Sequence, residues 1–285
     1  MRARVYYKLL TEIGFKRIGD SFIRSFGLLW LLLEPGALFF PEKINFGWLG
    51  YFGLLSISLI IAILKNFPRR SVSQPLSSPD SEIEIKVGDL FNEETHLVIG
   101  FNDVFDTEIG EVIKASSVQG QFLTKVYGGD LTKFNADIEA LVQNYQTLRI
   151  HEPNKIRGKK WRYPIGSTIT LGTHDRRYFL TAYGFMNNDL TVSSNSDYIL
   201  ASLSSLWKEV RLKGHGMNVA IPIIGADLAR TGLPRMTLAK LIITSFIIAS
   251  KEKYVTRKLT IMIFPADLDS INFYELKDFL VTACF

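Results

Sequence analysis

Apolar side chains are concentrated in one block of the chain, between positions 26 and 64, whereas the remaining sequence mixes apolar and polar residues as soluble domains do. Within this block, the nineteen positions from Phe46 to Leu64 carry no charge. At about 1.5 Å per residue, a helix of that length approaches the roughly 30 Å hydrocarbon thickness of a bilayer. The pattern therefore predicts a transmembrane helix over 46–64.

A second apolar stretch, from Ser25 to Phe40, precedes this helix and is interrupted by Glu34 and Pro35. The polar residues 41–45 make a short turn between the two stretches, which favours a helical hairpin. Glu34 would be an ionisable group at membrane depth, so it faces either protein and water or the headgroups. A hairpin buried in a soluble protein and a cleaved signal peptide are the competing interpretations, but no small-residue cleavage site follows the first stretch.

Positive charges flank the hairpin on both sides, and the turn holds only Lys43. The positive-inside rule then predicts a multi-pass membrane protein with both termini in the cytoplasm. Anionic lipid headgroups explain the net charge of +5 more simply than nucleic acid does, because much of the basic excess lies beside the apolar block. The flanking cations are Arg2, Arg4, Lys8, Lys16, Arg17, Arg24, Lys65, Arg69 and Arg70.

Residues 66–81 are rich in proline and serine and are typical of an extended linker, so we expect a membrane part over 1–65 and a second domain over 82–285. In that domain, strand patterns alternate with helix patterns, which predicts an α/β fold with a mixed sheet sandwiched by helices. A third membrane span over 234–250 is the less favoured alternative to a buried helix. Strands are expected over 83–87, 96–100, 168–171, 178–183, 217–222 and 259–264, and helices over 131–145, 197–212 and 234–250.

The amino-acid composition excludes some kinds of site. With 47% hydrophobic and 21% charged residues, the chain is expected to fold, and its one cysteine, Cys284, excludes an intramolecular disulfide framework. The four histidines lack the spacing of a metal site, so we expect no metal and no cofactor.

Two loops that follow predicted strands carry ligand-binding side chains, at the place where α/β sheets form their binding crevices. The first is Gly88-Asp89-Leu90, which is joined by Asn102 and Asp103 after the second strand. A carboxylate can accept from an exocyclic amino group, and an amide offers both a donor and an acceptor to a ribose. A plain turn is the alternative reading of each motif.

The second loop runs from Ile221 to Pro234, is bounded by Gly225 and Gly232, and leads from a strand into a helix. Backbone amides at such a helix start suit a diphosphate, and Arg230 adds positive charge.

At these residues the sequence resembles the macro domain, the ADP-ribose-binding family, from about residue 82 to the end. The resemblance implies that Asp89 meets adenine, Asn102 the distal ribose, the 225–233 loop the diphosphate, and Phe264 or Phe273 the adenosine side. The sequence departs from the family in three ways. Val104–Thr107 replace its glycine-rich first loop, the second loop is longer than usual, and Asp227 puts a negative charge near the diphosphate. The expected ligand-binding residues are Asp89, Leu90, Asn102, Asp103, Gly225, Ala226, Asp227, Leu228, Ala229, Arg230, Thr231, Gly232, Leu233 and Phe264.

Two membrane helices before such a domain resemble the membrane-linked macro effectors of Thoeris antiphage defence. The resemblance implies a bacterial inner-membrane protein, a homo-oligomer, that senses an ADP-ribose conjugate made from NAD by a TIR-domain partner, disrupts the membrane and causes abortive infection. A membrane-anchored ADP-ribosyl hydrolase, with Asp103 or Asp106 as its base, is the enzymatic alternative. A nucleic-acid binder acting through the basic run 155–162 is a third reading; that run could also be a solvated loop, a lipid anchor or a cationic wall for the ligand.

Overall fold

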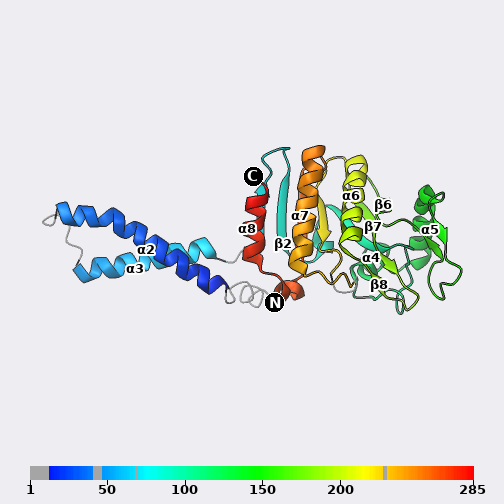
Figure 1. Cartoon of the computed structure of the whole chain (residues 1–285), viewed down its shortest axis with the longest axis horizontal. Coiled ribbons are helices and arrows are strands. Elements are labelled where there is room, and N and C mark those ends of the chain that lie inside the picture. Colours follow the sequence, from blue (N-terminus) through cyan, green and yellow to red (C-terminus); the bar gives the residue numbers. More distant parts are fainter. Residues whose placement is uncertain (1–12, 41–46, 68–69, 227–229) are drawn as a thin grey trace. The chain divides into compact units, whose positions relative to one another are not determined.

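The computed structural model describes residues 13–40, 47–67, 70–226 and 230–285. The chain divides into two compact units, and the boundary in the sequence lies between Arg70 and Ser71 (Figure 1). The first unit consists of two helices, α2 (Ile13–Phe39) and α3 (Gly47–Asn66), which pack against each other. Phe26 meets Tyr51 edge to face at 6.1 Å, and the Asn66 amide donates to the Ser21 hydroxyl at 2.8 Å.

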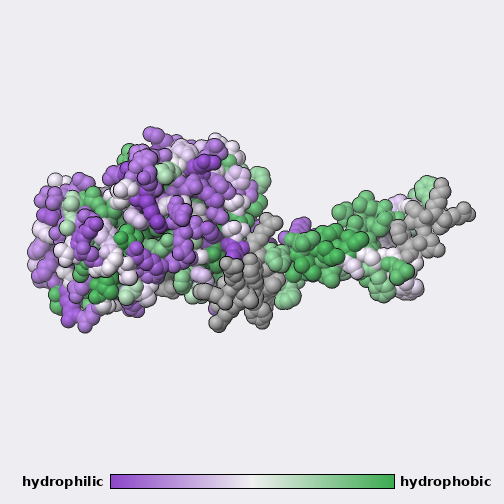
Figure 2. Space-filling view, turned by 180° about the vertical axis from the view of Figure 1, so that it is seen from behind, coloured by the Kyte–Doolittle hydropathy of each residue, from purple (hydrophilic) through white to green (hydrophobic). Residues whose placement is uncertain are grey.

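Both helices of the first unit are long and apolar enough to cross a bilayer, judged by length and composition. Their outward side chains are largely hydrophobic on the face shown in Figure 2. The predicted pair of apolar helices is therefore confirmed, whereas the predicted turn over 41–45 lies outside the described residues.

The first helix is longer than the apolar stretch from Ser25 to Phe40 that predicts it. Helix α2 begins at Ile13 and continues through Pro35. Phe15, Ile18 and Phe22 recur at three- and four-residue spacing within its basic first part, so an apolar stripe of helical period extends beyond the continuous apolar block.

The second unit is built on a mixed sheet with the strand order β1-β2-β10-β9-β3-β7-β6, to which β8 adds beside β7. The five strands β2, β10, β9, β3 and β7 run parallel, and β1, β6 and β8 are antiparallel to their neighbours. The strands are β1 (Ser71–Pro75), β2 (Glu82–Val87), β3 (His96–Asn102), β6 (Thr168–Gly172), β7 (Arg177–Met186), β8 (Val192–Ser193), β9 (Val219–Pro222) and β10 (Lys258–Ile263).

Helices cover both faces of this sheet, so the predicted α/β sandwich is confirmed (Figure 1). Helices α4 (Val118–Tyr127) and α5 (Leu131–Val142) bury Phe122 and Phe134 against β3 and β7. On the other face lie α6 (Ser196–Lys213), α7 (Arg235–Glu252) and α8 (Phe273–Ala283). Helix α7 is buried among its neighbours, which agrees with the preferred reading of 234–250 as a core helix rather than a span.

The predicted linker over 66–81 is wrong for its second half. Residues 71–75 form edge strand β1, whose register pairs Ser71 with Lys86 and Pro75 with Glu82. Leu76 is buried, and the Ser81 hydroxyl donates to the Thr256 carbonyl at 2.8 Å. Serine and proline favour loops when only neighbouring residues in the sequence are considered. This segment is instead held by pairing with β2 and by the hydrogen bond from Ser81 to Thr256, which lies 175 residues away in the sequence.

His96, the first residue of β3, is fully buried, and its ring links β3 to two other segments by hydrogen bonds. Its Nδ1 accepts from the Arg177 amide at 3.1 Å, and its Nε2 donates to the Gly214 carbonyl at 3.2 Å, so the ring is neutral in this arrangement. Burial is the main reason that the pKa of His96 lies below its usual value, and the Arg177 charge lowers it further.

We expect this histidine to make stability fall in mild acid. Because the pKa is lower in the folded state, the unfolded chain binds the extra proton first, and the free energy of unfolding decreases as pH falls below about 6.5. Denaturant titrations at pH 7.5 and 5.5 should show a smaller pH-dependent loss for His96→Gln than for the natural chain. His151→Gln, at an exposed position, is the control for replacing a histidine with glutamine.

Candidate functional site

Four of the predicted site segments meet at one edge of the sheet. Parallel strands β2, β10, β9 and β3 are consecutive neighbours, so their carboxyl ends lie side by side. In that order these ends are followed by Asp89, Phe264, the loop containing Gly225, and Asn102. Three strand spacings separate the outer two, roughly 14 Å. The sheet thus arranges the expected adenine, diphosphate and ribose contacts in one row.

Asp89 lies in the turn after β2 and caps the 3-10 helix η1 (Leu90–Asn92). Its Oδ1 accepts from the Phe91 amide at 3.0 Å, and its Oδ2 pairs with Lys125 Nζ of α4 at 2.7 Å. Burial raises the pKa of the Asp89 carboxyl, but Lys125 and the Phe91 amide outweigh it and leave the pKa below its usual value. The carboxylate is therefore ionised at neutral pH and keeps lone pairs for an amino group.

Asn102 ends β3 and is 2% exposed. Its Oδ1 accepts from the amides of Val104 and Asp106, at 3.2 and 3.1 Å, and so shapes the following loop. Its Nδ2 is buried without a hydrogen-bond partner. A buried amide donor without a partner is unfavourable in an isolated fold, and an oxygen of a bound ligand would satisfy it.

Asp103 and Asp106 are buried beside Asn102, and both are held by cations from residues 155–162. Asp103 Oδ2 pairs with Arg162 at 2.7 Å and its Oδ1 accepts from the Met186 amide at 2.8 Å. Burial raises the pKa of Asp103 despite these partners. Asp106 pairs with the fully buried Lys155 at 3.2 Å. These two carboxylates hold the loop after β3 in place through their ion pairs and hydrogen bonds.

In the loop after β9, the Thr231 side chain bonds to backbone groups on both sides of it in the sequence. The Thr231 hydroxyl donates to the Gly225 carbonyl at 3.0 Å and accepts from the Leu233 amide at 3.2 Å. Gly225 has φ +84°, a backbone conformation that favours glycine, and a Cβ there would displace the end of the Ile199 side chain. Ala226 is partly exposed, Gly232 has φ +71°, and Asp227, Leu228 and Ala229 lie outside the described residues.

Helix α7 begins directly after this loop. Pro234 occupies its N-cap position and supplies no side-chain cap, so the first amides of the helix have no acceptor of that kind. Arg230 is exposed and helps to lower the pKa of Asp189 in the β7–β8 turn, after the larger contributions of the Thr191 hydroxyl and amide. The open helix start and Arg230 give this loop the features of an anion site.

The structure distinguishes the two aromatic candidates. Phe264 follows β10 and is 50% exposed, so its ring is accessible for stacking, whereas Phe273 is 7% exposed and belongs to the core under α8. Leu90 is also a core side chain, 5% exposed, and only its backbone lies at the site edge.

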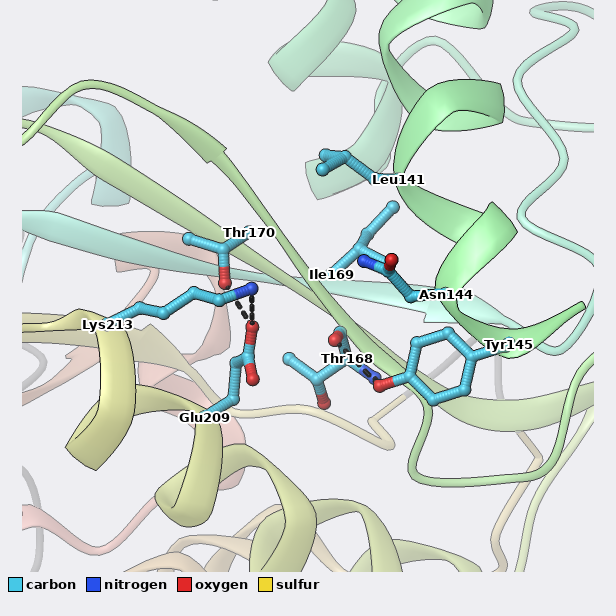
Figure 3. A pocket seen from close by; sticks show the side chains of 8 residues that line it. All are labelled: Leu141, Asn144, Tyr145, Thr168, Ile169, Thr170, Glu209 and Lys213. Carbon is cyan, nitrogen blue, oxygen red and sulfur yellow. Dashed lines mark hydrogen bonds and ion pairs between the residues drawn. The ribbon is translucent and has the colours of Figure 1, made fainter.

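A pocket of about 280 Å³ lies elsewhere, at edge strand β6, between α6 and the end of α5 (Figure 3). Its polar groups bond to one another: Glu209 accepts from Thr170 and pairs with Lys213, each at 2.7 Å. The Tyr145 hydroxyl bonds to the backbone of Thr168. No predicted site residue lines this pocket.

Comparison with known proteins decides the family. The family model of the macro domain of Thoeris protein ThsA matches residues 83–264, which is more than half of the chain. The chain belongs to this family. Thoeris protein ThsA of Bacillus amyloliquefaciens (strain Y2) is 28% identical over 237 residues, which cover 79% of this chain and 77% of that protein. The family predicted from the sequence is therefore confirmed.

Solved macrodomains of Oceanobacillus iheyensis are similar in structure. A mutant of that macrodomain aligns with a TM-score of 0.50 at 18% identity, covering 75% of this chain and 99% of the other. The same macrodomain with ADP gives a TM-score of 0.47 at 18% identity, covering 75% and 97%. The first of these alignments agrees with the macro fold of this family.

The cations that pair with the carboxylates of the site lie far from them in the sequence, so local sequence patterns do not predict these pairs. Lys125 reaches Asp89 across 36 positions, Lys155 reaches Asp106 across 49, and Arg162 reaches Asp103 across 59. The composition of the basic run 155–162 gives no sign that the charged groups of Lys155, Lys159 and Arg162 are buried. Only the fold brings these residues to the carboxylates.

Proposed function

We propose that this protein is a membrane-bound effector of bacterial antiphage defence whose macro domain binds an ADP-ribose-derived messenger made by a TIR-domain protein. Binding changes the assembly or packing of the two helices, disrupts the inner membrane and causes abortive infection. Membership in the ThsA macro-domain family is the observation that carries this proposal.

The geometry of the carboxyl edge supports the choice of ligand. The adenine contact is proposed for Asp89, with the accessible ring of Phe264 beside it. The diphosphate would meet the 225–233 loop and the uncapped start of α7, and the unpartnered Nδ2 of Asn102 would donate to the distal ribose. Charge and hydrogen-bonding capacity thus follow the order of groups along ADP-ribose.

The buried ion pairs favour sensing over hydrolysis. A hydrolase needs a carboxylate that can take a proton from an oriented water. Asp103 and Asp106 are committed instead to Arg162 and Lys155, and both carboxyl groups are almost fully buried. We therefore propose binding without turnover as the role of this site.

Helices α2 and α3 are the part of the protein that we propose disrupts the membrane. A messenger can shift the protein toward a membrane-active state only if it binds that state more tightly than the resting state. The apolar character of α2 and α3 is the basis for placing this state in the bilayer, with both ends of the hairpin on the cytoplasmic side.

Deleting residues 13–66 is expected to abolish membrane damage while ligand binding persists. Dye-loaded liposomes carrying the full chain should leak when nucleotides produced from NAD by a TIR-domain enzyme are added, and liposomes mixed with the deletion variant should not. Leakage caused by the deletion variant, or full-chain leakage that ignores the nucleotides, would contradict the coupling.

A further inference from the structure

One segment of the second unit, residues 148–161 around the ribbon of β4 (Ile150–His151) and β5 (Trp161–Arg162), concentrates exposed apolar side chains. Leu148, Ile150, Ile156 and Trp161 are 58%, 70%, 81% and 39% exposed. They are four of the eleven large hydrophobic residues that are exposed in the described part of this unit, and they lie within fourteen positions. Single exposed apolar residues are common, but such a concentration marks a contact surface.

The segment is held firmly at its base, so its exposure belongs to an ordered surface. The Tyr163 amide donates to the Asp103 carbonyl at 2.8 Å, and the Lys159 amide donates to Asp106 Oδ1 at 2.6 Å. Lys155 turns inward to its buried ion pair. These bonds leave Ile156, the neighbour of Lys155, facing solvent.

The charges of the segment are predominantly positive. Residues 148–161 contain five lysine or arginine residues and one acidic residue, Glu152. Lys155 is neutralised internally by Asp106, Arg157 pairs with Glu111, and the Lys159 ammonium is buried. Lys160 is exposed, and Arg149 lies 3.9 Å over the ring of Trp161. Trp161 shares one face of the ribbon with Arg149 and His151, and Ile150 lies on the other face. A ribbon with an aromatic ring and a cation on one face and an exposed aliphatic side chain on the other fits the interfacial region of an anionic bilayer.

The position of the segment in the fold fits the same partner. Its bonds to Asp103 and Asp106 place it at the carboxyl edge of the sheet. The chain also joins the domain at this edge, because Ser71, the first residue of β1, pairs with Lys86 near the carboxyl end of β2. Within this unit, the first residue of β1 and the segment 148–161 therefore lie at the same edge of the sheet.

We propose that residues 148–161 dock on the surface of an anionic lipid bilayer. The inference rests on the proposed membrane location of α2 and α3. Nucleic acid fits the segment less well, because its one tryptophan already contacts Arg149 and His151 and its remaining exposed apolar groups are aliphatic.

The test places an environment-sensitive fluorophore on Ile156→Cys in the full chain, in a Cys284→Ala background, reconstituted into nanodiscs. A label on Ile248→Cys, at a 64% exposed position of α7, is the matched control. In discs containing phosphatidylglycerol, the label at 156 should be blue-shifted and quenched several-fold less by an aqueous quencher than in pure phosphatidylcholine discs, while the control stays unchanged. Lys160→Glu, or salt raised to about 1 M, should remove the protection.

Equal aqueous quenching at 156 and 248 in anionic discs would overturn the proposal, as would protection that depends on protein concentration, which would point to a protein partner. Co-elution of the chain with the discs is scored separately. A chain that does not enter the discs contradicts the proposed membrane location, whereas an inserted chain with an unprotected label contradicts only the docking.

Discussion

Replacing Asn102 with aspartate is expected to weaken binding of ADP-ribose by roughly 10- to 100-fold, the effect of losing one buried hydrogen bond worth about 1–3 kcal/mol. The substitution keeps the oxygen that accepts from Val104 and Asp106 and replaces the unpartnered Nδ2 donor with a second oxygen. It therefore separates the ligand contact from the support of the loop. Equilibrium titration of the purified full chain measures the change.

Asn144→Asp is the matched control for this titration, because Asn144 lines the separate pocket at β6. It should bind ADP-ribose as the natural chain does. Unchanged affinity in Asn102→Asp would remove Asn102 from the site, and thermal melts of both variants show whether the domain stays folded.

Replacing Lys155 with methionine is expected to destabilise the macro domain by about 3–5 kcal/mol, because it leaves the Asp106 carboxylate buried without its cation. For a unit of this size that corresponds to a fall in Tm of about 6–20 °C. Thermal unfolding of the full chain in detergent, followed by near-ultraviolet circular dichroism, measures the shift.

Lys160→Met is the control at an exposed position and should change stability by about 0.5 kcal/mol or less. Adding Asp106→Asn to Lys155→Met should recover part of the loss, since the uncompensated charge is then gone. A fall in Tm for Lys155→Met no larger than that of the control would show that the pair does not hold the loop.

The sequence predicts the strands well because each is a short run of β-branched and aliphatic residues that ends at a polar or glycine-containing turn. Those turns also locate Asp89, Asn102, Gly225 and Phe264, and parallel pairing brings them to one edge. Edge strand β1 was missed because its residues, apart from Val72, are polar or proline, and its structure comes from pairing with β2.

The ion pairs and hydrogen bonds of the site carboxylates could not be predicted from the sequence for a related reason. Asp103 was expected to bind ligand, but its carboxylate is occupied by Arg162 and the Met186 amide. Asp89 is paired with Lys125 on another element. Such pairings depend on which side chains the fold places opposite one another, and local sequence patterns carry no record of them.

The central claim is that the macro domain holds an intact ADP-ribose-type ligand at the carboxyl edge of its sheet. The most direct test is a calorimetric titration of the full chain with ADP-ribose and with the nucleotides that a TIR-domain enzyme makes from NAD, followed by mass spectrometry of the bound fraction. We predict retention of an unaltered ADP-ribose-type nucleotide that Asn102→Asp reduces. Turnover of the ligand, or no binding to either sample, would contradict it.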